Sequence, residues 1–310
     1  DAQTRANVLE GLGTLRLDHL GDPDGAAEAF RTILSENPAA AGVRDRLAEA
    51  LEKAGKDREL LTLLSKWREP DYARSIRAGA AHIRLGDWAG ALDAFLGATS
   101  MDAEAERGWS GLERLMDEGS EPARSHAARA LVSRFRAQER HERLLQALEL
   151  AMEEAPEGRR AALLEIADLH AELGAPEAAY RAGARALDEG LLGPEDVEKL
   201  VHLATAADEV KDLAPRLERA QVGLREAARL YDGLAANPSR ARDAWQSVLQ
   251  QAPLDSEALE ALERLTAADD DAGRLAEVLA ARAEATQGDA RVDYLRRAAA
   301  LWRETEGADP

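Results

Sequence analysis

One spacing of apolar positions recurs along the chain. A small residue, an aromatic residue, an aliphatic residue and a proline follow one another at steps of four, three and five in two places: Ala26, Phe30, Ile33, Pro38 and Ala241, Trp245, Val248, Pro253. A partial copy lies between them, at Ala91, Phe95 and Ala98. Such steps place the apolar side chains on one face of a helix, and the proline ends that helix. The pattern therefore predicts a series of similar helices.

Glycine-containing breaks separate the predicted helices into pairs. The breaks at Gly21, Gly55, Gly86 and Gly119 are 34, 31 and 33 residues apart. Strand-like alternation of β-branched and aromatic residues is nearly absent, so we expect an all-α chain. In the first helix, over residues 5–20, the spacing predicts four inward-facing side chains: Val8, Leu12, Leu15 and Leu17.

This period is typical of the tetratricopeptide repeat (TPR), a helix–turn–helix unit of 34 residues. The chain resembles that family in having small residues where the two helices cross, an aromatic residue at the start of a second helix, and closing prolines: Gly79, Ala91, Ala167, Ala179, Trp88, Pro38 and Pro253. The resemblance implies an α-solenoid, a right-handed superhelix of about eight to nine TPR-like hairpins.

The resemblance also implies a concave groove that holds a peptide and is lined by the first helix of each hairpin. By position, the groove residues would include Leu15, Asp18, Glu49, Glu52, Ile76, Ala80, Ile83, Arg84, Trp109, Glu113, Asp168 and Glu172. One branch of the family binds a terminal carboxylate with a Lys and an Asn on successive turns. No asparagine here has a lysine one turn before it, so that clamp and co-chaperone function are not expected.

The repeat loses its register in the middle of the chain. Three helices follow one another, over residues 105–118, 122–136 and 139–154, and three helices cannot fill whole hairpins. We expect either a local break of the superhelix near 119–138 or a divergent repeat with an unusual turn. The predicted organisation is N-terminal TPR-like repeats over 1–118, an irregular segment over 119–158 and C-terminal repeats over 159–310, which end in an unpaired helix.

The same middle segment is rich in arginine. Its basic residues are Arg124, Arg129, Arg134, Arg136, Arg140 and Arg143. They could pair with acidic neighbours on exposed helix faces, where each pair contributes little. Alternatively, they could form a docking patch for an acidic segment of a partner.

No residue pattern indicates catalysis. The chain has no cysteine, and its six histidines lack the spacing of a zinc-binding helix. Gly11 and Gly13 lie within a predicted helix rather than after a strand, which argues against a dinucleotide site. We therefore expect no enzyme activity, no metal and no cofactor.

The net charge of −19 disfavours nucleic-acid binding, because no basic footprint is present to neutralise phosphates. No run of eighteen apolar residues is present, so membrane insertion is not expected. The Ala- and Arg-rich composition suggests a bacterial source, and the absence of an initiator Met suggests a fragment of a longer chain; a cytoplasmic location is favoured over a periplasmic one.

Three functions fit these features. The first is a non-catalytic scaffold that binds a protein or peptide partner. The second is a structural module that self-associates through its terminal repeats, and the third is a regulatory domain of a larger enzyme or signalling protein.

Overall fold

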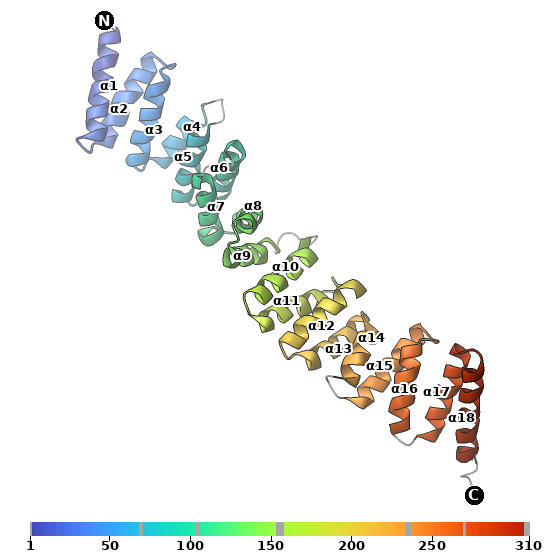
Figure 1. The fold of residues 1–310 in the computed structure, drawn as a ribbon. Coiled ribbons are helices and arrows are strands. Elements are labelled where there is room, and N and C mark those ends of the chain that lie inside the picture. The colour runs from blue at the N-terminus through green and yellow to red at the C-terminus, as the bar shows by residue number, and fades with distance from the viewer. Residues whose placement is uncertain are drawn as a thin grey trace. The chain divides into compact units, whose positions relative to one another are not determined.

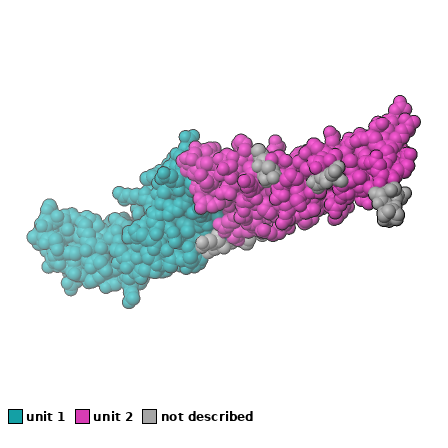
Figure 2. Space-filling model, turned by 90° about the horizontal axis from the view of Figure 1, so that it is seen from below, with its two compact units in different colours: residues 1–155 teal, residues 156–310 magenta. Residues whose placement is uncertain are grey.

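The computed structural model describes residues 2–67, 71–102, 104, 106–152, 158–233, 237–268 and 271–306. The chain divides into two compact units, residues 1–155 and 156–310 (Figure 2). Over the described ranges it forms eighteen α-helices and no strand (Figure 1). The predicted all-α solenoid of TPR-like hairpins is confirmed.

The described part of unit 1 contains nine helices. They are α1 (Ala2–Asp18), α2 (Pro23–Glu36), α3 (Ala41–Lys53), α4 (Asp57–Leu64), α5 (Tyr72–Arg84), α6 (Trp88–Met101), α7 (Glu106–Glu118), α8 (Ala123–Ala137) and α9 (His141–Met152).

The described part of unit 2 contains nine further α-helices and the short 3-10 helix η2. They are α10 (Arg159–Glu172), α11 (Pro176–Asp188), η2 (Pro194–Asp196), α12 (Val197–Ala206), α13 (Val210–Ala220), α14 (Leu224–Asp232), α15 (Pro238–Gln251), α16 (Ser256–Ala268), α17 (Ala272–Ala285) and α18 (Asp289–Glu306).

A left-handed residue forms the turn inside most hairpins. Gly55 and Gly86 have φ values of 69° and 72°, a conformation that glycine adopts without the steric penalty of a Cβ. The next residue then donates its N–H to a carbonyl five positions back, as Asp87 does to His82 at 2.9 Å. Asp87 also caps α6 by accepting a hydrogen bond from the Gly90 N–H. These turns explain the spacing of Gly21, Gly55 and Gly86 in the sequence.

The aromatic residue of the repeated pattern fills the space between neighbouring helices. Phe95 on α6 is 4% exposed. A Cβ built on Gly79 of α5 would lie 2.6 Å from the Phe95 ring, and one on Gly111 of α7 would be closer still. The two glycines therefore let the first helices of successive hairpins close over one ring.

The turns of unit 1 change between Gly86 and Glu139, in the region where the sequence predicts a loss of register. Gly119, the fourth glycine of the spacing series, is not in the left-handed conformation, and the α7–α8 connection contains a cis peptide bond before Pro122. The left-handed turn occurs instead at Glu139, between α8 and α9, where φ is 53°. Glu139 follows Gly86 by 53 residues, which is one repeat and one additional helix. A bend of the superhelix at this point stays a prediction.

One prediction about the core was wrong. Val8, Leu12 and Leu15 are 65%, 37% and 45% exposed, whereas Leu17 is buried. Helix α1 has apolar residues on two faces, and the face that includes Leu17 is the one that packs against the following helices. Periodicity alone could not distinguish the two faces.

Candidate functional site

Four predicted groove residues lie together on α5. Ile83 is buried, Ile76 and Ala80 are half-buried, and Arg84 is exposed. The Arg84 guanidinium donates two hydrogen bonds, of 2.6 and 2.9 Å, to Asp57 at the start of α4. Because Asp57 is only 7% exposed, Arg84 compensates a carboxylate that is shielded from water. That hydrogen bond also raises the pKa of Arg84.

Two further predicted groove residues, Trp109 and Glu113, lie on α7. The guanidinium of Arg134 stands 4.9 Å from the centre of the Trp109 ring. Glu113 accepts hydrogen bonds from Arg140 at 2.7 and 3.2 Å. Both side chains therefore have partners within unit 1.

The last two predicted groove residues, Asp168 and Glu172, lie on α10 of unit 2. Asp168 pairs with Lys199 of α12 at 2.8 Å. Glu172 also interacts within the chain. A single groove that includes residues of α5, α7 and α10 stays a prediction.

Ion pairs join the first helices of successive hairpins. Asp18 of α1 pairs with Arg46 of α3, and Arg229 of α14 makes two hydrogen bonds of 2.6 Å to Glu257 of α16. The Asp168–Lys199 pair joins α10 to α12 in the same way. The partners are about one repeat apart in sequence, so each pair holds two hairpins in register.

The arginine-rich segment is paired within unit 1. Arg140 binds Glu113, Arg143 binds Asp117 at 2.8 Å, and Arg134 binds Glu106. Arg124 donates to the backbone carbonyl of Met116 at 3.0 Å. Arg129 and Arg136 also have interactions within the chain. These contacts favour the interpretation of local pairing, while the docking patch stays a prediction.

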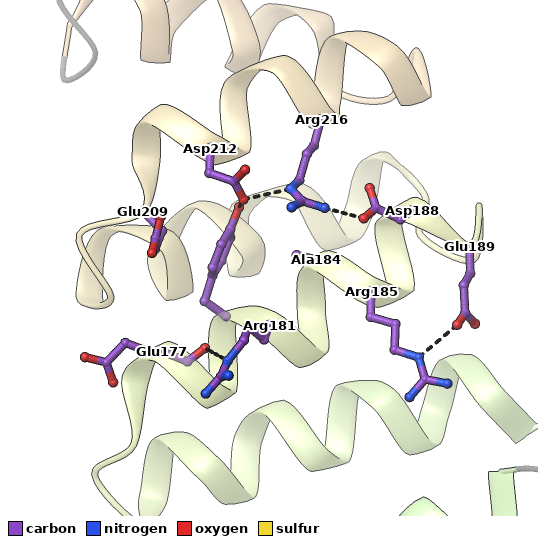
Figure 3. Close-up of a pocket in the computed structure, with 10 residues that line it drawn as sticks. Glu177, Arg181, Ala184, Arg185, Asp188, Glu189, Glu209, Asp212 and Arg216 are labelled. Atoms are coloured by element: carbon purple, nitrogen blue, oxygen red, sulfur yellow. Dashed lines mark hydrogen bonds and ion pairs between the residues drawn. The ribbon is translucent and has the colours of Figure 1, made fainter.

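A depression of about 810 Å³ lies between the second helices α11 and α13 (Figure 3). Ala184 and the buried Tyr180, both on α11, line it. The Tyr180 hydroxyl donates to Asp212 at 2.8 Å, and Asp212 also accepts from Arg216 at 2.7 Å. The predicted groove residues came from first helices, so this depression was not anticipated.

The ionisation of this cluster is determined by its contacts. Burial, together with the hydrogen bond to Asp212, raises the pKa of Tyr180, so the phenol stays protonated. Burial opposes ionisation of Asp212, but the hydrogen bonds from Arg216 and Tyr180 outweigh it and lower the pKa of that carboxyl. The cluster therefore joins two hairpins through a protonated phenol and an ionised carboxylate.

Two smaller depressions adjoin along the first helices of unit 2. One lies between α12 and α14, and the other lies between α14 and α16 over Trp245 of α15. One sequence signal could have indicated the second depression. Arg229 and Ala261 stand 16 residues before and after Trp245, where Gly79 and Gly111 flank Phe95.

Over the described ranges, the histidine and carboxylate side chains form no cluster that could hold a metal ion. His82 hydrogen-bonds Asp87 at 2.8 Å, a contact that ties helix α5 to the turn after it. None of the helices in the described part of the chain is both apolar and long enough to cross a bilayer.

Comparisons with known proteins find similarity to solved structures alone. No protein-family model matches the chain, and no curated protein sequence does. Among solved structures, the TPR domain of P58(IPK) aligns with 97% of this chain and 99% of its own, at 14% identity and a TM-score of 0.30. A tetratricopeptide repeat protein from Parabacteroides merdae aligns over 96% and 99%, at 14% identity and a TM-score of 0.34.

The Cut9–Hcn1 assembly is also similar. One of its chains aligns with 96% of this chain and 55% of its own, at 15% identity and a TM-score of 0.28. At such low TM-scores these likenesses carry no argument about function. The TPR-like description is founded on the helix pairs and turns of the chain itself.

Proposed function

We propose that the chain is a non-catalytic scaffold that binds a peptide or protein segment along the first helices of its hairpins. One observation carries this proposal: the first helices of successive hairpins are joined by ion pairs, as in Asp168–Lys199 and Arg229–Glu257. A face held in register in this way is preorganised, which reduces the ordering that binding requires.

Selection of random 12-residue peptides displayed on phage, with the full 310-residue chain as the target, tests this function. Recovered peptides should lose affinity when Glu172 on α10 is changed to Arg, while helicity by circular dichroism stays unchanged. Glu28→Arg, an exposed position on the second helix α2, is the matched control. Failure to enrich any peptide over the bare support would contradict the scaffold function.

Self-association is a second candidate, because apolar side chains are exposed on α1 and α18. Val8 and Leu15 on α1 are 65% and 45% exposed, and Val292 and Trp302 on α18 are 46% and 41% exposed. Light scattering should then show growth with concentration that Trp302→Lys abolishes and Ala300→Lys, on the same helix, leaves intact. A constant mass at all concentrations would exclude this candidate.

A further inference from the structure

One of the two adjoining depressions of unit 2 is lined by aliphatic side chains, and the other is lined by Trp245. The first, of about 460 Å³, has an apolar floor of Val197, Val201 and Leu230 between α12 and α14. The second, of about 450 Å³, lies between α14 and α16 and is lined by Trp245. Arg229 borders both depressions, so they are adjacent, and we call the two together the track.

The second depression exists because of a change in residue size around the aromatic ring. Phe95 is covered by two glycines, each 16 residues away in sequence. The corresponding residues around Trp245 are Arg229 and Ala261, and both line the depression. Their side chains keep α14 and α16 from closing over the ring as α5 and α7 close over Phe95.

Trp245, which lines the depression, carries a buried donor that has no acceptor. Trp245 is 2% exposed, and its indole N–H makes no hydrogen bond to the described residues. The equivalent residues Phe30 and Phe95 have no polar atom. A buried N–H without a partner is unfavourable, and buried tryptophans usually find one. Because this nitrogen is shielded from water, an oxygen acceptor of a bound molecule would satisfy it once the side chains that cover it move aside.

The track has an excess of negative charge. Six carboxylates and two guanidiniums line its two parts. Both guanidiniums are already engaged, Arg229 with Glu257 and Arg264 with Asp232. Glu198 and Glu260 are exposed, and neither has an ion-pair partner among the residues that the structure describes. They are available to a cation.

We propose that this track binds an extended basic segment of a partner protein. An aliphatic side chain of that segment contacts Val197, Val201 and Leu230, and its lysine or arginine side chains face Glu198 and Glu260. A backbone or side-chain oxygen of the segment accepts the hydrogen bond of the Trp245 indole. Phosphate-bearing ligands are excluded by the acidic lining, because a phosphate would be repelled there. The inference depends on the scaffold function and names its site and partner chemistry.

Three variants of the full chain test the site with peptides recovered from the phage library. Wild-type protein should enrich peptides that carry lysine or arginine beside an aliphatic residue. The double variant Glu198→Lys, Glu260→Lys should weaken their binding at least tenfold in fluorescence anisotropy. Trp245→Phe keeps an aromatic ring and removes the N–H, so it should weaken binding about three- to tenfold, the effect of one hydrogen bond.

The matched control is Glu277→Lys, Glu284→Lys, which makes the same charge change at exposed positions of α17. It should stay within twofold of wild type. A peptide with its basic residues replaced by glutamate should bind the Glu198→Lys, Glu260→Lys variant better than wild type. All variants concern side chains at the track or the surface, and thermal unfolding verifies that each one folds.

Two outcomes distinguish failure of the proposed site from failure of the scaffold function. If peptides are enriched and respond to Glu172→Arg but bind the two track variants as tightly as wild type, the track is wrong and the scaffold function stands. If no peptide is enriched, both are overturned.

Discussion

Two hairpins that share one sequence pattern differ in how tightly the neighbouring helices pack around its aromatic residue. In α5–α6, Phe95 is closed in by Gly79 and Gly111, and no space is left for even a Cβ. In α14–α15, Trp245 is equally buried but borders a depression of about 450 Å³ and keeps an unsatisfied N–H. The first hairpin is built for packing, and the second gives up some packing beside its ring.

The comparison extends to the ion pairs around each hairpin. Arg84 of α5 pairs with Asp57, whose side chain is 8% exposed. Arg229 of α14 pairs with Glu257, and these side chains are 51% and 40% exposed. Burial makes the first pair a requirement of the fold, whereas the second remains accessible to a binding partner. Similar charges therefore have different roles in the two places.

Replacing Phe95 or Trp245 should give the largest difference in unfolding free energy between the two hairpins. Phe95→Ala should lower the free energy of unfolding by roughly 3–5 kcal/mol, because it leaves a cavity between two hairpins. Trp245→Phe should lower it by less, about 1–2 kcal/mol, because a smaller aromatic ring still fills most of the site and loss of the unsatisfied donor offsets part of the cavity cost. Urea denaturation measures both. Leu96→Ala, at a neighbouring exposed position, is the control, and an equal loss in that variant would contradict the prediction.

Replacing Arg84 should likewise cost more stability than replacing Arg229. Arg84→Met should destabilise the chain by about 2 kcal/mol, because the buried Asp57 carboxylate loses its partner. Arg229→Met should lower stability by less than about 1 kcal/mol, as expected for an exposed pair. Urea denaturation of the two variants checks this. Equal effects would show that burial does not distinguish the pairs.

Replacing a glycine beside Phe95 by alanine should give the smallest change in stability. Gly111→Ala should destabilise by about 1–2 kcal/mol through overpacking against the ring. Gly97→Ala, within α6 and with open space around its Cβ, should instead stabilise by up to about 1 kcal/mol through helix propensity. Thermal unfolding of both variants measures the difference in sign. A stabilising Gly111→Ala would show that the helices can separate without loss.

Much of the fold could be predicted from the sequence. The left-handed turns at Gly55 and Gly86 follow from glycine spacing, and burial of Phe95 follows from helical periodicity. The inward assignment of Val8 failed because α1 is apolar on two faces. The turn at Glu139 could not be predicted, because a left-handed glutamate has no distinctive sequence signal.

The candidate sites were harder to predict than the fold. Arg140 and Arg143 were identified by charge, but their pairing with Glu113 and Asp117 depends on contacts between residues 26 or 27 positions apart. Trp245 was identified as a repeat aromatic, and its unsatisfied N–H was not. Hydrogen-bond satisfaction depends on every neighbour of an atom, and one-dimensional spacing does not specify those neighbours.

The sequence by itself determined that this protein is a chain of helical hairpins, because helix periodicity, turn glycines and closing prolines act over short distances. Only the tertiary structure decided which charges are occupied and which remain free, and where the helices close over a ring or stay apart. The reason is physical: pairing and packing depend on residues a full repeat away, and the size of one side chain at the crossing, such as Gly111 or Ala261, changes the result.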